Sequence, residues 1–439
     1  MSENHEGERA ARVHRTIEQV ARDSYGRLLA FLAVRCRDVS AAEDALADAF
    51  QTALETWPRN GIPEKPEAWL LVAGRRKLID GMRRSRIRGE AIPDLLAGTE
   101  NAYEMAGESL LFPDERLKLM FVCAHPAIEA QARTPLMLQT VLGLDAARIA
   151  SAFLVRPSAM GQRLTRAKSK IRVAGIRFEV PEAAQLPERL EFVLEAIYAA
   201  YGSGWDDITG ADARRKGLAA EAVELARLLV QLMPDEPEPK GLLAMMLHCE
   251  ARREARRTQS GSYVPLLEQD VTCWSKEMMG EAERLLCEAS RRGRIGRFQL
   301  EAAIQSAHAQ RARTGVTDWN AIALLYEGLV RLSPTVGALV GRAAVIAEAQ
   351  GPAAGLSALE LLPDAVVQTY QPYWALAGHL FKRLGRISEA QCAYSRAIGL
   401  SEEPALRRFL EAEISKSDER DSDTHLIGSS DAEGSVHHR

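Results

Sequence analysis

The stretch from residue 144 to 177 constrains the fold most, because it carries two helical patterns separated by a short break. Ile149, Ala150 and Phe153 lie on one face of a first helix. Pro157 fits the first turn of a second helix, where its missing N–H leaves no hydrogen bond unmade. Apolar residues then recur along one side of the second helix at Met160, Leu164, Ala167 and Ile171. This pattern predicts a helix-turn-helix.

The second of these helices is basic and carries no acid. Between residues 156 and 177 the chain has seven Arg or Lys residues and no Asp or Glu. Solvated helices usually mix both signs, so this pattern favours a recognition helix in the major groove of DNA, although a solvated face stays open. The residues predicted to contact DNA are Ser158, Gln162, Arg163, Arg166, Lys168 and Lys170.

A second cationic helix is expected over residues 66–84, after a loop rich in proline. Its helical wheel places Trp69 with four basic residues, Arg76, Lys77, Arg83 and Arg84. An aromatic ring among cations suits single-stranded nucleic acid, because the ring stacks on an unpaired base while the cations follow the backbone. The alternative is that Trp69 packs under the preceding loop.

A helix with an acidic face is predicted between the first predicted helix, residues 12–32, and the cationic helix at residues 66–84. Ser40 is its predicted N-cap, and Leu46, Ala49, Ala53 and Trp57 face inward together with Phe50 and Leu54. The acidic residues on its other face are Glu43, Asp44, Asp48 and Glu55. That face is either a docking surface for a basic partner or simply solvated.

Composition places the chain among helical proteins without a catalytic motif. Alternating strand patterns are missing, which predicts an all-α fold. The net charge of −4 shows that the basic helices are local features, offset elsewhere. No apolar run is long enough to cross a bilayer and no leader is recognisable, so we expect a cytoplasmic protein. Because no catalytic motif is present, we expect that the protein is not an enzyme. We expect no metal site, no cofactor, reduced buried thiols, and histidines such as His248 and His308 as hydrogen-bonded packing residues.

Three stretches together resemble the sigma-70 family of RNA polymerase sigma factors, in the compact extracytoplasmic-function (ECF) form. They are AAEDALADAFQTALETWP at 41–58, PEAWLLVAGRRKLIDGMRR at 66–84 and ARIASAFLVRPSAMGQRLTRAKSKIR at 147–172. The sequence departs from the pattern at Gly74 and Gly81, where better helix formers are expected. The resemblance covers roughly the first 180 residues.

The resemblance implies a role for each helix. The acidic helix would dock on core RNA polymerase through Asp44, Asp48, Phe50 and Leu54. The helix from Pro157 would read the −35 promoter element with the six residues given above. The residues implied to engage the −10 element are Trp57, Arg59, Asn60, Trp69, Arg76, Lys77, Arg83 and Arg84.

The rest of the chain is predicted to be a helical scaffold. Residues 371–404 match the tetratricopeptide (TPR) pattern, residues 319–334 form a weaker half-repeat, and residues 221–256 resemble the extension of an ECF subgroup with a TPR-like domain. Such a stack would bind a peptide or protein, pack on the sigma domains, or add polymerase contacts. The polar segment 415–439 is predicted to be a disordered tail.

The predicted organisation is therefore two small helical sigma domains followed by a TPR-like α-solenoid. Region 2 is expected over residues 10–86, a linker over 87–113, region 4 over 114–180 and the C-terminal domain over 182–412. The predicted partners are core RNA polymerase, promoter DNA and a peptide or protein. The alternative function is a polymerase-independent helix-turn-helix regulator with a repeat-built sensor domain.

Overall fold

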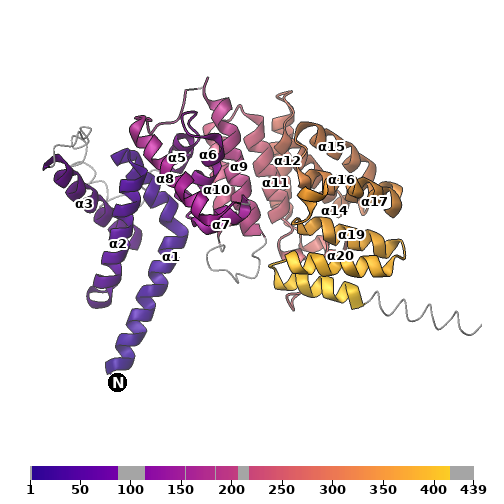
Figure 1. Cartoon of the computed structure of the whole chain (residues 1–439), viewed down its shortest axis with the longest axis horizontal. Helices are drawn as coiled ribbons and strands as arrows, with labels where there is room; N and C mark the ends of the chain where they lie inside the picture. The colour runs from indigo at the N-terminus through magenta and orange to yellow at the C-terminus, as the bar shows by residue number, and fades with distance from the viewer. Residues whose placement is uncertain (1, 88–113, 154, 183, 206–216, 416–439) are drawn as a thin grey trace, which may run out of the picture. The chain divides into compact units, whose positions relative to one another are not determined.

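The computed structural model describes residues 2–87, 114–153, 155–182, 184–205 and 217–415, and its ribbon is helical almost throughout (Figure 1). In these residues the β pairing is limited to an isolated bridge between Arg257 and Tyr263. The all-α prediction is confirmed. Nearly all of the predicted linker and tail lie outside the described residues. Among the described helices, none combines the length and apolar run needed to span a lipid bilayer.

The chain divides into two compact units, residues 1–229 and 230–439. The sequence placed a domain boundary at about residue 181 instead. Helix α9 (Leu186–Trp205) accounts for the difference, because it packs on α5 (Arg116–Cys123) and α6 (Ala130–Thr140) of the first unit. The segment after residue 181 therefore begins as part of the N-terminal unit.

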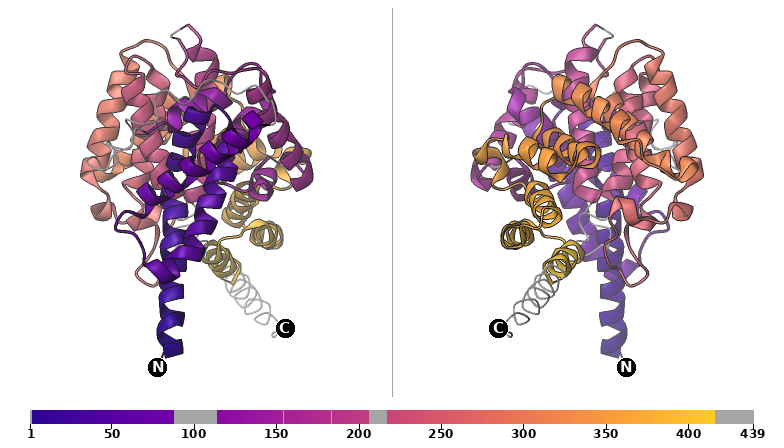
Figure 2. Two further views of the ribbon diagram at one scale, coloured as in Figure 1. Left: turned by 90° about the vertical axis from the view of Figure 1, so that its left-hand side faces the viewer. Right: turned by 90° about the vertical axis from the view of Figure 1, so that its right-hand side faces the viewer.

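The N-terminal unit opens with three packed helices, α1 (Ser2–Cys36), α2 (Val39–Asn60) and α3 (Pro66–Ile87). The first turns of α1 extend past the other two helices (Figures 1 and 2). Arg37 ends α1 with a positive φ of 56°, and the Asp38 side chain caps α2 by accepting from the backbone N–H of Ala41. The predicted N-cap, Ser40, is thus wrong by two residues, because the chain leaves α1 directly into an extended Asp38.

One small residue, Gly74, brings α3 close to its neighbours. Leu70, Gly74 and Leu78 are buried at a spacing of four residues, and a Cβ added at Gly74 would lie 3.1 Å from Leu32 Cδ1. Leu71, next to Leu70, is only half-buried. Glycine has a low helix propensity, and the close packing against Leu32 explains why it stands at position 74. Gly81 meets nothing within 4 Å and has no such explanation.

The second half of this unit contains α5, α6, α7 (Ala146–Ala152), α8 (Pro157–Val173), α9 and α10 (Leu218–Leu232). Helix α6 contacts α5, α7, α8 and α9, so it is the centre of this group. Its residues Leu136, Met137 and Leu138 are almost fully buried. The helix-turn-helix pair α7 and α8 is thereby held against a well-packed core.

In the second unit, helices pack mainly on their neighbours along the chain. Besides short 3-10 turns, its helices are α11 (Pro237–Glu250), α12 (Lys276–Ser290), α13 (Arg297–Ala309), α14 (Arg311–Thr314), α15 (Trp319–Leu332), α16 (Val336–Gln350), α17 (Pro352–Glu360), α18 (Asp364–Val367), α19 (Gln371–Arg383) and α20 (Ile387–Leu400). Sequential packing of this kind is the arrangement of an α-solenoid.

The predicted tetratricopeptide segment folds as the antiparallel pair α19 and α20. Gly378 lies against the ring of Tyr394, and Ala390 and Ala397 are fully buried in the same cluster. Gly378 on α19 thus lies directly under the Tyr394 ring of α20. The cysteines are only partly as expected, since Cys273, Cys287 and Cys392 are exposed.

Candidate nucleic-acid interface

Helix α8 presents one apolar and one polar face. Met160, Leu164, Ala167 and Ile171 are its buried residues, which confirms the predicted stripe. The helix begins at Pro157, after an extended Arg156 that makes no side-chain cap. Proline suits this first position, because its ring fixes φ at a helical value.

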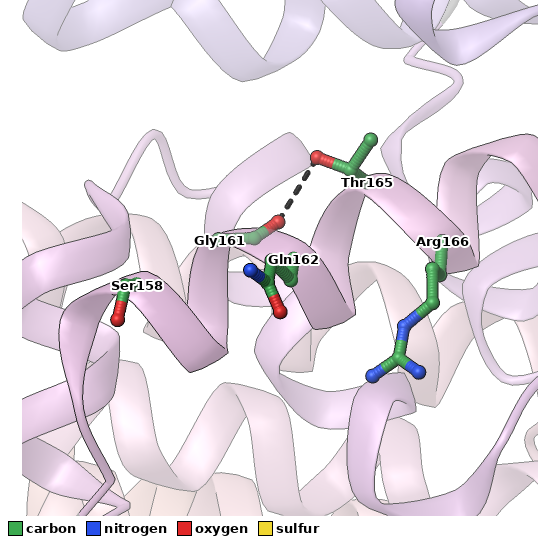
Figure 3. Close-up of a pocket in the computed structure, with 5 residues that line it drawn as sticks. All are labelled: Ser158, Gly161, Gln162, Thr165 and Arg166. Atoms are coloured by element: carbon green, nitrogen blue, oxygen red, sulfur yellow. Dashed lines mark hydrogen bonds between the residues drawn. The ribbon is translucent and has the colours of Figure 1, made fainter.

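The opposite face of α8 is open to solvent. Ser158, Gly161, Gln162, Thr165 and Arg166 line a shallow depression of about 520 Å³ along it. Figure 3 shows Ser158, Gln162 and Arg166 following one another on the same side of the helix, at intervals of four residues. Thr165 instead turns its hydroxyl back to the Gly161 carbonyl at 2.9 Å. Three of the predicted DNA-contacting residues therefore project together.

The remaining predicted contacts of α8 differ in exposure. Lys170 is exposed, whereas Arg163 is half-buried and donates to the Gln131 carbonyl at 3.4 Å. Lys168 donates to both carboxylate oxygens of Glu43 on α2, at 2.6 Å each, and its side chain is only 12% exposed. Lys168 is therefore occupied by an acidic partner in this conformation.

Helix α7 and the turn hold α8 in place. The Asp145 side chain caps α7 by accepting from the N–H of Arg148 at 2.9 Å, and Ile149 and Ala150 are buried. The expectation that Phe153 shares their buried face is wrong, since Phe153 is 37% exposed. Phe153 is the C-cap residue of α7, and its ψ of 7° turns the chain out of the helix at this point.

Most of the basic face of α3 is exposed as predicted. Arg76, Lys77 and Arg83 are exposed, while the Arg84 side chain lies outside the described residues. Lys77 Nζ lies 3.7 Å from Asp48 Oδ2 of α2, and both side chains are about half exposed. A surface pair of this kind contributes little stability, so Lys77 is readily available to phosphate.

The two tryptophans of this region have different environments. Trp57 is 1% exposed and lies in the core of the three-helix group, so its predicted contact with the −10 element is corrected: its indole cannot reach DNA in this conformation. Trp69 is half-buried, and its ring meets that of Trp57 edge to face with centroids 5.4 Å apart. Arg59 and Asn60, at the end of α2, are exposed.

The predicted docking residues lie on the outer surface of α2. Asp44 and Asp48 are exposed one turn apart, Leu54 is 38% exposed and Phe50 is half-buried. An exposed leucine among acids is consistent with a surface that a partner covers. The structure thus brings together carboxylates and apolar groups that the sequence assigned to one function.

A buried ion-pair cluster was not anticipated from the sequence. Arg116 on α5 is 3% exposed and pairs with Asp114 at 2.7 Å and with Glu221 of α10 at 3.0 Å. Burial raises the pKa of Glu221 to about 7, although Arg116 opposes this shift. Arg116 and Glu221 are 105 residues apart, and no local pattern marks such a pair.

The part of the chain that the structure describes holds no group of three or more His, Cys, Asp or Glu side chains placed to bind a metal ion. The site therefore consists of two basic helices, α3 and α8, beside the acidic helix α2. Such an arrangement is suited to binding an anionic polymer.

Comparisons with known proteins match two separate stretches of the chain. Residues 20–87, which cover the second half of α1 together with α2 and α3, match the family model of sigma-70 region 2. Residues 189–290 match a family of unknown function (DUF6596), which includes the predicted extension at 221–256. The region 2 match supports a sigma-70 family factor, whereas the ECF subgroup and the TPR character stay predictions.

A relative in Rhizobium meliloti (strain 1021), described as an uncharacterized protein, is 40% identical over 370 residues. The match covers 83% of this chain and 87% of the relative, so it includes both units. No solved structure matches.

Proposed function

Because the chain belongs to the same family as the uncharacterized Rhizobium meliloti protein and contains a sigma-70 region 2, we propose that it is a transcription initiation factor of the ECF type. It binds core RNA polymerase and directs it to promoters with −10 and −35 elements. The observation that carries this proposal is the match of residues 20–87 to sigma-70 region 2. Catalysis belongs to the polymerase, and the factor acts in the cytoplasm.

The exposed faces of α3 and α8 support the DNA-binding part of the proposal. Gln162 and Arg166 project from α8 at a spacing that fits neighbouring bases in the major groove. Arg76 and Arg83 on α3 supply phosphate contacts near melted DNA, with Trp69 as the aromatic group beside them. Such contacts give salt-dependent affinity from phosphates and specificity from base edges.

The acidic helix supports the polymerase-binding part. A factor that only represses transcription needs one DNA-binding helix, not a second basic helix beside an acidic surface with Asp44 and Leu54 exposed. We propose that this surface docks on core polymerase. The second unit then acts as a TPR-like scaffold that modulates activity or binds a peptide, an idea supported by the packing of Gly378 on Tyr394.

The test is transcription from the upstream DNA of the chain's own operon with purified full-length protein and core polymerase. We expect co-elution with the polymerase and specific transcripts. Gln162→Ala and Arg166→Ala should each lower affinity for the −35 duplex by roughly ten- to a hundredfold, the usual effect of losing a base contact. Arg331→Ala, at an exposed arginine of α15, is the matched control. Unchanged promoter binding by both α8 variants would refute the recognition-helix assignment.

A further inference from the structure

The connection between α11 and α12 is the longest in the described part of the second unit. It spans residues 251–275, whereas residues 333–335 alone join α15 to α16. Connections longer than about 12–15 residues are uncommon in compact domains, and those that are ordered usually carry a function. Residues 257–274 of this connection, the strap, contain two short 3-10 turns, Leu266–Glu268 and Val271–Cys273.

The first half of the strap is a tight hairpin. The backbone N–H of Val264 donates to the Arg256 carbonyl at 2.9 Å, and Gly261 lets the chain turn with a positive φ of 81°. Arg257 and Tyr263 face one another in an antiparallel bridge. Side chains that are paired across such a bridge lie on the same face, so the hairpin presents one cation beside one aromatic ring.

Both side chains contact the C-terminal part of the second unit. Arg257 forms an ion pair with Glu403, and these side chains are only 9% and 14% exposed. The Tyr263 ring meets the Phe409 ring edge to face, with centroids 5.3 Å apart. Phe409 belongs to the helical residues 404–415, whereas the helices of this unit pack mainly on their neighbours along the chain. The hairpin therefore joins the beginning of the unit to its end.

The second half of the strap contacts α14. The Arg311 guanidinium donates to three backbone carbonyls, those of Leu266, Leu267 and Gln269. The bonds to Leu266 and Gln269 are both 3.0 Å long. The same guanidinium lies over the Trp274 ring, 5.3 Å from its centroid. Because every peptide has the same backbone carbonyls, Arg311 holds the strap without reading its sequence.

Glu403, Phe409 and Arg311 together have the chemistry of a peptide-binding surface. Glu403 offers a carboxylate to a cation, and Phe409 offers a ring to an aromatic side chain. Arg311 adds donors for the backbone of an extended chain. The strap has little regular secondary structure, and segments of this kind open at a lower free-energy cost than packed helices. Its exchange for another segment can therefore proceed while the helices stay folded.

We propose that the strap is a tethered ligand of the second unit, and that an extended segment of a partner protein displaces it from Arg311, Glu403 and Phe409. The partner segment presents a cationic and an aromatic side chain on one face, as Arg257 and Tyr263 do. The inference rests on the part of the proposed function that gives the second unit a peptide-binding role. It requires neither polymerase nor promoter DNA.

A fluorescent peptide with the sequence of residues 255–270 tests the exchange, with the full-length protein as the receptor. Arg257→Ala/Tyr263→Ala releases the strap, so this double variant should bind the peptide roughly tenfold more tightly than wild type, in which the strap competes at high effective concentration. Fluorescence anisotropy measures both affinities. Glu268→Ala changes an exposed strap residue and should bind the peptide as weakly as wild type. Equal affinities of the double variant and wild type would overturn the tethered ligand.

Adding Glu403→Gln to the double variant tests which surface the peptide occupies. This change keeps the shape of the side chain and removes the carboxylate that pairs with arginine. Peptide binding should therefore weaken roughly tenfold, as expected for the loss of a charge-assisted contact. Unchanged binding would place the peptide elsewhere and refute the assigned surface.

Hydrogen exchange on proteins with an intact strap decides the question if the double variant does not fold. Glu403→Gln alone should speed exchange of the Val264 amide roughly tenfold, because the hairpin loses its buried ion pair, while the amides of α16 keep their protection. Unchanged exchange would show that Glu403 does not hold the strap. These measurements contain no polymerase or DNA, so their failure overturns the tethered ligand and leaves the transcription assay to decide the proposed function.

Discussion

At the scale of single residues, burial decides which side chains are exposed enough for the roles predicted from the sequence. Trp57 and Trp69 look alike in the sequence, since both flank a proline loop near basic residues. In the structure Trp57 is a core residue, and Trp69 keeps part of its surface open. His248 was expected to be a hydrogen-bonded packing residue, but neither of its ring nitrogens has a hydrogen-bond partner.

Replacing the two tryptophans should separate stability from function. Trp57→Ala removes a fully enclosed ring and should lower the free energy of unfolding by about 3–5 kcal/mol. Trp69→Ala should cost less stability but reduce promoter melting. Urea denaturation and permanganate footprinting of the melted strand measure the two effects. Equal stability losses would contradict the difference in burial.

Glycine substitutions in α19 and α20 test the repeat packing. Gly378→Ala should destabilise the second unit by about 1–3 kcal/mol despite its better helix propensity, because the added methyl group would lie 2.7 Å from the Tyr394 ring. Gly399→Ala meets nothing within 4 Å and should stabilise by up to about 1 kcal/mol. Thermal denaturation compares the two. A stabilised Gly378→Ala protein would refute the close packing.

The histidine His248 should make the second unit acid-sensitive. Burial lowers the pKa of His248 from 6.5 to about 4, and the charge of Arg252 adds to this effect. The pKa is lowered even though a Glu283 carboxylate oxygen lies 3.5 Å from Nε2. A depressed folded-state pKa means that the stability contribution is complete above pH 6.5 and is lost as pH falls toward 4. The loss at low pH is at most about 3 kcal/mol.

His248→Leu should therefore flatten the pH dependence of stability between 6.5 and 4. Urea midpoints at a series of pH values measure this slope for wild type and variant. His308 also has its pKa lowered to about 4 by burial, so part of the slope should remain. An identical slope in both proteins would show that His248 does not titrate with folding.

At the scale of elements, the short-range patterns describe helices well and their partners poorly. The stripe of α8 follows from spacing alone, because one face must be apolar wherever the helix packs. The partners of the cations on α8 do not follow from spacing, because Lys168 binds the Glu43 carboxylate, which is 125 residues away in the chain. The same holds for α5, where Arg116 lies buried between Asp114 and Glu221.

Arg116→Ala tests the link between α5 and α10. It leaves Asp114 and Glu221 without their buried cation and should cost about 3 kcal/mol at pH 8, where Glu221 is ionised. Because the pKa of Glu221 is already raised to about 7, protonation should shrink this penalty as pH falls. Arg177→Ala, which removes an exposed pair with Glu179, is the control and should stay within about 0.5 kcal/mol. Equal penalties at pH 6 and pH 8 would contradict the assignment to Glu221.

At the scale of the whole molecule, the boundary between the two units changes what a truncation means. Residues 1–232 keep α9 against α5 and α6, and keep Glu221 of α10 with Arg116. Residues 1–182 lose both contacts and expose the buried surface of α6. The first fragment should be a stable monomer and the second should aggregate or unfold. Gel filtration and circular dichroism check this, and a well-folded 1–182 fragment would restore the earlier boundary.

The sequence by itself determined the all-α fold, the helix-turn-helix and the buried stripe of α8, because these depend on residue spacing within one helix. It also identified the acidic and basic faces, although not which of their charges are paired. Only the tertiary structure decided that Trp57 is core, that Lys168 is held by Glu43 and that α9 and α10 belong with the N-terminal unit. Each of these depends on helices far apart in the chain meeting at a particular register, which local periodicity does not encode.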